Sequence, residues 1–322
     1  MSYDKLWPPN HRDVAESTQS TGVMQRGLIF RSAQFYTALH LAKMNVKTVV
    51  DVRRPTPSAA DGVDGVRHLQ LNFVPNGSTG WRTVFLMPPC GTHSLARICI
   101  WPFDAKKVIV QGLMTDNERL CKFYWLVLTY STVEIKEAVR VFATEANYPI
   151  LIHCIHGKDR TGILVALIAM VCGANLDAVC DDYASSDGNL QAAFRAGAIP
   201  AHESWLFEPA DNEALRCTRT PRIVMHTTLT RVKAEFGGVL QYLLSIGVTQ
   251  AELDAIQRNA GIAVSSAGGG AEEEEEAALV EEDASLLAEP PAAEAEVASV
   301  AAAEEEVGGD DGVVVLPPAP AE

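Results

Sequence analysis

Residues 153–162 of the chain read His153-Cys154-Ile155-His156-Gly157-Lys158-Asp159-Arg160-Thr161-Gly162, and they join two apolar segments. The segment before them, residues 149–152, is short, β-branched and begins with proline, which predicts a buried strand. The segment after them, residues 163–171, is long enough for a buried helix that ends at Gly173. The ten residues are therefore a strand-to-helix turn. Such a turn presents backbone N–H groups and the positive end of a helix dipole to an anion.

The side chains of this turn suit chemistry on a bound phosphoryl group. Close to a helix N-terminus and to the cations of Lys158 and Arg160, the thiol of Cys154 is expected to be a nucleophilic thiolate at neutral pH. The planar guanidinium of Arg160 can bind two phosphoryl oxygens at once. Gly157 allows a sharp bend and a close approach of the backbone to a ligand. The hydroxyl of Thr161 is expected to hydrogen-bond the cysteine sulfur.

The spacing of Cys154 and Arg160 resembles the Cys-x5-Arg phosphate loop of the protein tyrosine phosphatase superfamily. The form Gly-Lys-Asp-Arg-Thr-Gly at residues 157–162 is similar to the atypical, bacterial-type phosphatases of that superfamily, some of which accept both protein and lipid phosphates. The resemblance implies that Cys154 and Arg160 are catalytic. It implies that the other loop residues shape the loop or bind substrate, namely His153, Ile155, His156, Gly157, Lys158, Thr161 and Gly162.

Shorter segments elsewhere resemble landmarks of the same group, so the resemblance covers residues 10–260 in patches and is weakest at 54–117. These segments are residues 10–14, 27–34, 46–53, 175–186 and 235–243. We interpret Arg31 as a member of a structural ion pair or as part of a solvated edge. Asp51 and Arg53 either organise the floor of the active site or form a buried salt bridge or a turn cap near a strand end.

Local sequence patterns and the resemblance together predict an α/β domain with a mostly parallel central sheet flanked by helices. The expected strands are residues 46–53, 66–73 and 149–152, and the resemblance implies another at 27–34. The expected helices are residues 36–45, 116–131, 133–146, 163–171, 223–236 and 238–260, and the resemblance implies another at 175–186. Residues 188–222 are predicted to be rich in loops, and residues 55–117 to hold a substrate-facing insertion or lid. The aromatic stripe at residues 123–130 is interpreted as core.

Charge and composition separate a phosphatase domain, residues 1–262, from a tail, residues 263–322. The chain has a formal net charge of −15, but 17 of its 41 Asp and Glu residues and none of its 26 Lys and Arg residues lie in the tail. The domain therefore holds 26 basic and 24 acidic groups and is close to neutral. The tail is rich in alanine and glutamate and poor in aromatic residues, which predicts disorder.

The cysteines and the N-terminus favour a soluble, cytoplasmic protein. The seven cysteines have neither metal-ligand spacing nor the framework of a secreted protein, and several lie in apolar runs, so we expect reduced thiols. They are Cys90, Cys99, Cys121, Cys154, Cys172, Cys180 and Cys217. The first residues lack a signal-peptide pattern, and no run of about 18 apolar residues is present.

The mechanism expected from the loop needs no metal and no cofactor, but it needs a general acid. Where related enzymes carry an aspartate after a strand, this chain has Asn76, which cannot donate a titratable proton. Asp159 stays near the phosphate because it lies inside the loop, and it is our assignment. Asp104, in a Trp-Pro-Phe-Asp segment, is second, and Asp116 is another option.

Lys158 offers a second cation at the mouth of the site, which favours phosphoinositides alongside phosphotyrosine proteins as substrates, although a solvated lysine is the alternative. His156 is expected at the surface. We expect no nucleic-acid partner and at most peripheral membrane contact. A catalytically silent phosphate-binding module is the main rival. A rhodanese-type sulfurtransferase or an arsenate reductase is disfavoured by Thr161-Gly162 and Asp182-Tyr183.

Overall fold

The computed structural model describes residues 7–18, 24–74, 113–207, 212 and 216–262. Within them lies a five-stranded sheet of order β1-β2-β5-β3-β4. β1 is antiparallel to β2 and the other three neighbouring pairs are parallel, which confirms the predicted mostly parallel sheet. The strands are β1 (Arg12–Asp13), β2 (Ile29–Ser32), β3 (Thr48–Asp51), β4 (Arg67–Gln70) and β5 (Ile150–His153).

The central strand β5 is the predicted strand before the Cys154 turn. Ile150, Leu151 and Ile152 have no exposed surface. Because side chains alternate along a strand, Ile150 and Ile152 enter the larger core on one face, and Leu151 enters a smaller core on the other. His153 is paired with the last residue of β2 and the last residue of β3. The turn after β5 therefore leaves the sheet between the carboxyl ends of two parallel neighbours, where ligands bind in open α/β sheets.

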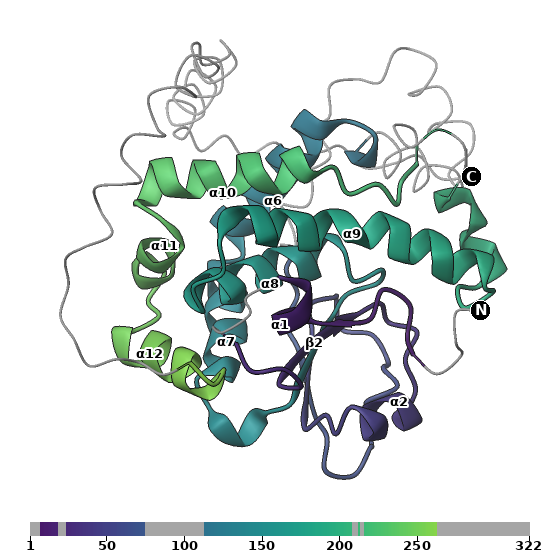
Figure 1. The fold of residues 1–322 in the computed structure, drawn as a ribbon, viewed down its shortest axis with the longest axis horizontal. Helices are drawn as coiled ribbons and strands as arrows, with labels where there is room; N and C mark the ends of the chain where they lie inside the picture. Colours follow the sequence, from purple (N-terminus) through teal and green to yellow (C-terminus); the bar gives the residue numbers. More distant parts are fainter. Residues whose placement is uncertain (1–6, 19–23, 75–112, 208–211, 213–215, 263–322) are drawn as a thin grey trace, which may run out of the picture. The chain divides into compact units, whose positions relative to one another are not determined.

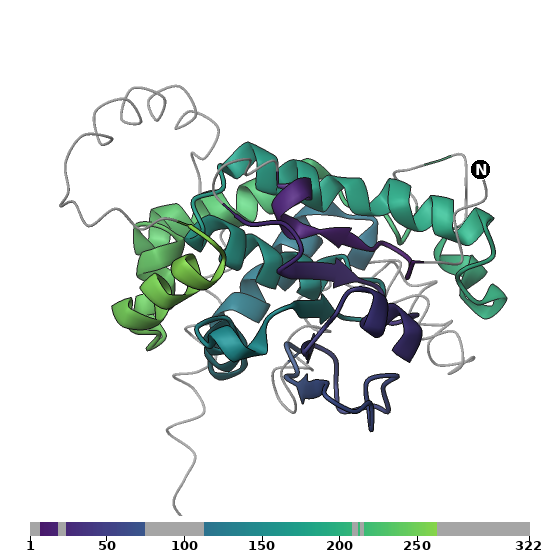
Figure 2. The same cartoon turned by 60° about the horizontal axis from the view of Figure 1, so that its bottom comes forward.

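The helices lie on both faces of this sheet. They are α1 (Val14–Ser17), α2 (Ala38–Lys43), α6 (Asn117–Tyr130), α7 (Thr132–Phe142), α8 (Asp159–Val171), α9 (Leu176–Arg195), α10 (Arg222–Phe236), α11 (Val239–Ser245) and α12 (Gln250–Asn259). There are also two 3₁₀ segments. η1 (Glu145–Asn147) lies between α7 and β5, and η2 (Ala201–Leu206) lies between α9 and α10. In Figures 1 and 2, α2 lies on the side of the strands opposite to the long helices α8, α9 and α10.

Helix α8 is the centre of the larger core. It packs against β5 and against α1, α6, α7, α9, α11 and α12. All of its residues from Thr161 to Ala169 are buried, as expected for a helix that is apolar on every side. This burial fixes the axis of α8, and therefore the direction in which its N-terminus faces the Cys154 turn.

The expected elements are mostly confirmed, with three differences. α9 continues to Arg195, so residues 188–222 hold half a helix and η2 as well as loops. Its buried face mixes apolar residues such as Tyr183 and Leu190 with Asp182, Ser186 and Asp187, and these polar positions interrupt the apolar periodicity. The helix expected at 238–260 is two helices, α11 and α12, because the chain turns at Gly247 with φ +91°. α8 begins at Asp159, before its apolar run.

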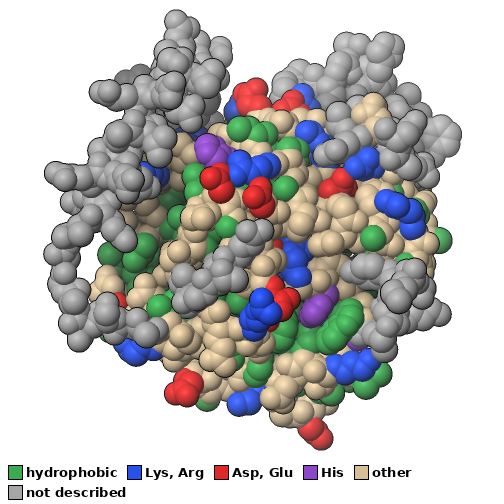
Figure 3. Space-filling view, viewed as in Figure 1, with side chains coloured by type: hydrophobic (Ala, Val, Ile, Leu, Met, Phe, Trp, Pro, Cys, Tyr) green, Lys and Arg blue, Asp and Glu red, His purple; other side chains and the backbone are tan. Residues whose placement is uncertain are grey.

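Some predictions fall outside the described residues. The lid and Asp104 lie in residues 75–112, and the tail is residues 263–322, so both stay predictions. The five described cysteines are free thiols. No helix among the described residues is long and apolar enough to cross a membrane. On the face seen in Figure 3, the described Lys and Arg side chains are interspersed with Asp and Glu, as the near-neutral charge of residues 1–262 predicts.

Candidate active site

Surrounding residues hold the turn after β5 by donating hydrogen bonds to its carbonyl groups. The side-chain amide of Asn10 donates to the carbonyls of His156 and Gly157, both at 3.0 Å. Arg31 donates to the carbonyl of Gly157 at 2.7 Å. The backbone N–H of Gln34 donates to the carbonyl of Ile155 at 2.9 Å. Nδ1 of His153 lies 3.0 Å from the carbonyl of Cys154.

These bonds decide where the amides of the turn point. In a trans peptide the carbonyl and the following N–H point in opposite directions, so carbonyls bound outside turn the amides of residues 155–158 inward. None of the amides of residues 155–159 donates to another residue in the part of the chain that the structure describes. Inward amides at the N-terminus of α8 form an anion-binding nest.

Gly157 is the position at which this shape requires glycine. Its φ is +65°, and a Cβ there would lie 2.1 Å from the carbonyl oxygen of Ser32. The turn therefore rests directly on the end of β2. Gly162 is less constrained, because its added Cβ would meet the ring of Tyr183 at 3.1 Å.

On the β2 side, the turn is supported by the Asp182 cluster, which consists of Arg12, Arg31, Asp182 and Ser186. Arg31 has no exposed surface and pairs with Asp182, as does Arg12 at 2.6 Å. Arg12 also donates to the hydroxyl of Ser186 at 2.9 Å. Burial disfavours the carboxylate of Asp182, but the charges of Arg31 and Arg12 outweigh it and lower its pKa to about 2. The interpretation of Arg31 as a structural ion pair is confirmed.

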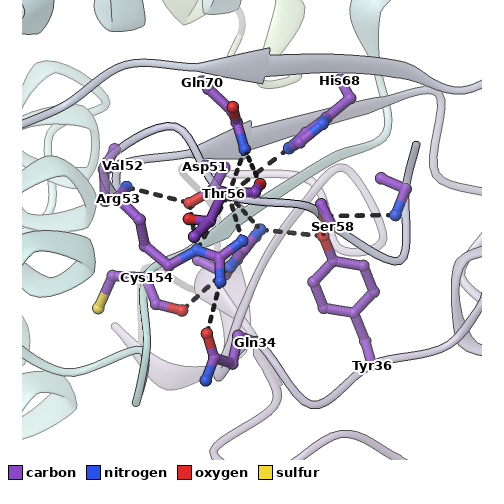
Figure 4. Close-up of polar contacts among 12 residues, drawn as sticks. Gln34, Tyr36, Asp51, Val52, Arg53, Thr56, Ser58, His68, Gln70 and Cys154 are labelled. Atoms are coloured by element: carbon purple, nitrogen blue, oxygen red, sulfur yellow. Dashed lines mark hydrogen bonds and ion pairs between the residues drawn. The ribbon is translucent and has the colours of Figure 1, made fainter.

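On the β3 side lies the Asp51 cluster, which consists of Asp51, Arg53, His68, Gln70 and His153. Figure 4 shows Asp51 with Arg53, His68 and Gln70. Arg53 binds both oxygens of Asp51, with Nε at 2.8 Å from Oδ1 and Nη2 at 2.6 Å from Oδ2. The carboxylate of Asp51 lies 3.7 Å from Nε2 of the buried His153. The buried salt bridge that we considered for Asp51 and Arg53 is therefore present.

His153 is a neutral imidazole that shapes the turn. Burial lowers the pKa of His153 to about 4, although Asp51 opposes this shift. Its Nε2 lies 2.9 Å from the hydroxyl of Tyr36, which is also 2.7 Å from Oγ of Ser58. Since His153 has no exposed surface, its contribution is to the shape of the turn.

A third polar group joins the turn to α6. Oδ1 of Asp159 accepts from Nζ of Lys158 at 2.9 Å and from the hydroxyl of Tyr124 at 2.8 Å. Tyr124 is 2.8 Å from the hydroxyl of Tyr183. Lys158 is 3% exposed and lies 3.4 Å from the sulfur of Met114. The alternative of a solvated lysine is therefore wrong, because the ammonium is buried and paired with Asp159, and the role of Lys158 in substrate binding stays a prediction.

The two residues of the Cys-x5-Arg pair lie at opposite ends of the turn. Cys154 follows β5 and is 3% exposed. Arg160 is in the first turn of α8, is half-buried, and donates to the carbonyl of Val52 at 3.3 Å, beyond the end of β3. Oγ1 of Thr161 is buried without a hydrogen-bond partner among the described residues, so the expected bond to the sulfur is not formed.

Three other predictions about single residues have structural outcomes. His156 is half-buried rather than fully exposed, because its Nε2 lies 2.6 Å from Oε2 of Glu203. Asp116 caps α6 by accepting from the N–H of Arg119. Tyr124 does belong to the core, as interpreted, but its hydroxyl reaches Asp159. The sequence offered one hint of this contact, which is that a tyrosine with a polar hydroxyl stands within a stripe of residues expected to be buried.

Sequence comparisons agree with this geometry. The chain belongs to the tyrosine phosphatase family, whose model matches residues 7–260. It is 28% identical over 161 residues to a tyrosine-protein phosphatase of Nostoc commune, covering 49% of this chain and 55% of that protein. It is 42% identical over 122 residues to the triple specificity protein phosphatase PtpB of Mycobacterium tuberculosis, covering 37% and 41%.

A shorter match is to an inositol diphosphatase. Over 50 residues the chain is 40% identical to inositol diphosphatase DSP2 of Arabidopsis thaliana, covering 16% of this chain and 20% of that protein. The chain thus spans about half, or less, of the length of these curated relatives.

Proposed function

We propose that this protein is a cysteine-dependent phosphatase that hydrolyses phosphotyrosine proteins, phosphoinositides or both through a phosphocysteine intermediate. The observation that carries the proposal is the set of carbonyls bound from outside, which turns the amides of residues 155–158 inward as a nest directly after Cys154 and at the N-terminus of α8. Such a nest binds the oxygens of a phosphoryl group. Membership of the tyrosine phosphatase family supports the same reaction class.

The reaction has two steps. The thiolate of Cys154 forms a bond to phosphorus while the bond from phosphorus to the leaving oxygen breaks, and the leaving oxygen takes a proton. Water then attacks the phosphocysteine, gives up a proton and releases phosphate and the thiolate. The guanidinium of Arg160 and the amides stabilise the charge that develops on the phosphoryl oxygens.

Asp159 supplies the proton in the first step and receives one in the second. In the structure its Oδ1 accepts from Lys158 and Tyr124, and both bonds suit a carboxylate. We infer that an anionic substrate draws the ammonium of Lys158 away from Asp159, so that the carboxyl group can hold a proton. A substrate with a second phosphate near Lys158 would do this best, which favours phosphoinositides.

The alternative is a phosphate-binding module of the same fold with little or no turnover. The paired carboxylate of Asp159 favours it, because a carboxylate that stays ionised cannot donate a proton. The intact pair of Cys154 and Arg160 favours the enzyme.

The deciding experiment measures turnover of p-nitrophenyl phosphate, a phosphotyrosine peptide, a phosphoserine peptide and a phosphoinositide by the full chain and by Cys154→Ser. The enzyme predicts turnover that Cys154→Ser abolishes while the variant still binds vanadate. Binding without turnover in the unaltered chain would support the silent module. Undiminished turnover by Cys154→Ser would exclude the mechanism.

The general acid has its own test. A general acid must be protonated, so activity should fall as the pH rises, and Asp159→Asn should flatten that fall. Asp116→Asn is the matched control, since asparagine also caps a helix. If Asp116→Asn flattens the profile instead, the acid is misassigned.

A further inference from the structure

The Asp51 cluster brings three metal-ligating atoms together from three neighbouring strands. Oδ2 of Asp51 in β3, Nε2 of His68 in β4 and Nε2 of His153 in β5 all lie within 4.8 Å of one another. Asp51 and His153 have no exposed surface, and the side chain of His68 is 9% exposed. These residues are far apart in the sequence, so the search for ligand spacings found no such group.

The other nitrogen of each imidazole is already occupied. Nδ1 of His68 lies 2.6 Å from Oδ1 of Asp61, and Nδ1 of His153 lies 3.0 Å from the carbonyl of Cys154. With Nδ1 directed at these oxygen acceptors, Nε2 is the nitrogen of each imidazole that faces the cluster. Metal-binding histidines are oriented in this way.

One ring nitrogen of His68 is unsatisfied. Its Nε2 is buried and has no hydrogen-bond partner among the described residues. It lies 3.6 Å from Oδ2 of Asp51, and Nε2 of His153 lies 3.7 Å from the same oxygen. Two imidazole lone pairs thus face one carboxylate oxygen, and a cation between the three would satisfy all of them.

The separations suit a small divalent cation. Ligands about 2.0–2.1 Å from a tetrahedral zinc ion lie roughly 3.3 Å from one another, close to the two separations here. Two imidazoles and one carboxylate are a ligand set that zinc takes in sites with an open fourth position.

Existing bonds compete with such a cation. Oδ2 of Asp51 accepts from Nη2 and Nε of Arg53 at 2.6 and 3.0 Å and from Nε2 of Gln70 at 3.4 Å. A carboxylate has about four acceptor sites, so Oδ1 can keep Nε of Arg53, at 2.8 Å, while a metal replaces donors on Oδ2. The hydroxyl of Tyr36 contacts Nε2 of His153 and would keep only its contact with Ser58.

We propose that Asp51, His68 and His153 form a binding site for a divalent transition-metal cation of the zinc type. His153 directly precedes Cys154 and holds its carbonyl, so occupancy of the site is coupled to the shape of the phosphate loop. The site does not depend on the reaction proposed above.

The test is a titration of the full-length Cys154→Ser variant with Co²⁺, followed by displacement with Zn²⁺. This variant lacks the loop thiolate, which would otherwise compete for metal. The visible absorption of bound Co²⁺ reports coordination by nitrogen and oxygen, and a near-ultraviolet charge-transfer band would report sulfur. We expect saturable binding, a visible band and no sulfur band.

Two variants and a control locate the ligands. His68→Gln removes a ligand and should weaken Co²⁺ binding by about 100-fold or more. Asp61→Asn replaces the charged acceptor that orients His68 by a neutral amide and should weaken binding by about 10-fold. His226→Gln in α10, outside the cluster, should bind as the parent does. Circular dichroism checks folding, and Asp61→Asn keeps the test valid if His68→Gln does not fold.

Three results would overturn the proposal. They are Co²⁺ binding that neither His68→Gln nor Asp61→Asn weakens, a sulfur band that assigns the metal to other cysteines, or no saturable binding. In the last case the cluster is held together by its own side-chain contacts alone.

Discussion

The Asp182 cluster and the Asp51 cluster support the same turn from the two neighbours of β5, but their balance of donors and acceptors is opposite. The Asp182 cluster has two guanidinium groups for one carboxylate, and Nε of its buried Arg31 has no acceptor among the described residues. The Asp51 cluster has one guanidinium group, one carboxylate and two imidazole lone pairs. The first cluster has spare donors, and the second has spare acceptors.

This difference separates two tasks. Surplus positive charge beside the turn raises the electrostatic potential where an anion would bind, and Arg31 also holds the carbonyl of Gly157. Surplus acceptors around Asp51 favour the binding of a cation or a proton. His153 links this cluster to the turn, because its Nδ1 lies next to the carbonyl of Cys154. The predictions below disturb one side at a time, from the largest expected effect to the smallest.

Asp182→Ala should have the largest effect. It leaves the buried charge of Arg31 unpaired, so the free energy of unfolding should fall by about 3–5 kcal/mol. Urea denaturation measures the change. Asp181→Ala on the same helix removes an exposed partner of Arg222 and should cost less than about 1 kcal/mol. Equal losses in the two variants would contradict the role of the Asp182 cluster.

Acid should weaken the two clusters in different pH windows. His153 has a pKa of about 4 in the folded protein and an ordinary value of 6.5, so its contribution is complete above pH 6.5 and is lost as the pH falls through 4. The loss should reach about 3 kcal/mol. Asp182 has a pKa of about 2 in the folded protein and an ordinary value of 3.8, so its contribution to the free energy of unfolding, about 2 kcal/mol, should be lost only below pH 4.

Denaturation at a series of pH values, with His153→Asn and Asp182→Asn, checks this order. His11→Asn is a necessary control, because burial also lowers the pKa of His11 to about 4. If His153→Asn leaves the slope between pH 6.5 and 4 unchanged, the imidazole is not the group that titrates there.

Gly157→Ala tests the turn that lies between the clusters. The added Cβ would lie 2.1 Å from the carbonyl oxygen of Ser32, so the turn must shift, and a shift of about 1 Å should lower kcat by about 100-fold. Gly188→Ala in α9 is the control, since nothing lies within 4 Å of its added Cβ and alanine favours helix by up to about 1 kcal/mol. Similar activity in both variants would contradict the requirement for glycine at position 157, where the backbone lies close to Ser32.

Tyr124→Phe should have the smallest effect on stability and a selective effect on activity. Losing the contacts of this hydroxyl with Asp159 and Tyr183 should cost about 1–2 kcal/mol. Tyr148→Phe is the control, because its buried hydroxyl donates to the carbonyl of Phe142. Both variants should lose stability, but only Tyr124→Phe should change the pH dependence of kcat. An identical profile in both would remove Tyr124 from the site.

Local pattern was enough to predict the elements that carry the turn. β5 is a short apolar run, α8 is a long one, and the residues between them form the Cys-x5-Arg motif, so fold class and loop followed from contiguous sequence. The contacts that shape the loop could not be predicted from contiguous sequence. Asn10 reaches Gly157 and Tyr124 reaches Asp159, and only the folded chain brings these residues together.

Lys158 illustrates the limit most clearly. Its position predicted a cation near the phosphate, but its direction depends on Asp159 beside it and on Met114 from another part of the chain. The buried acids of α9 were hidden for a similar reason, since Asp182 pairs with arginines of the first two strands.

The strand order has a consequence for how the protein is made. β5 lies between β2 and β3, yet it is synthesised after all the other strands. While the ribosome is still extending the chain, β2 and β3 each expose an unpaired edge of the kind that invites aggregation. The sheet closes only when β5 arrives, so a nascent chain should need chaperone protection until then, and catalytic competence should be among the last properties it acquires.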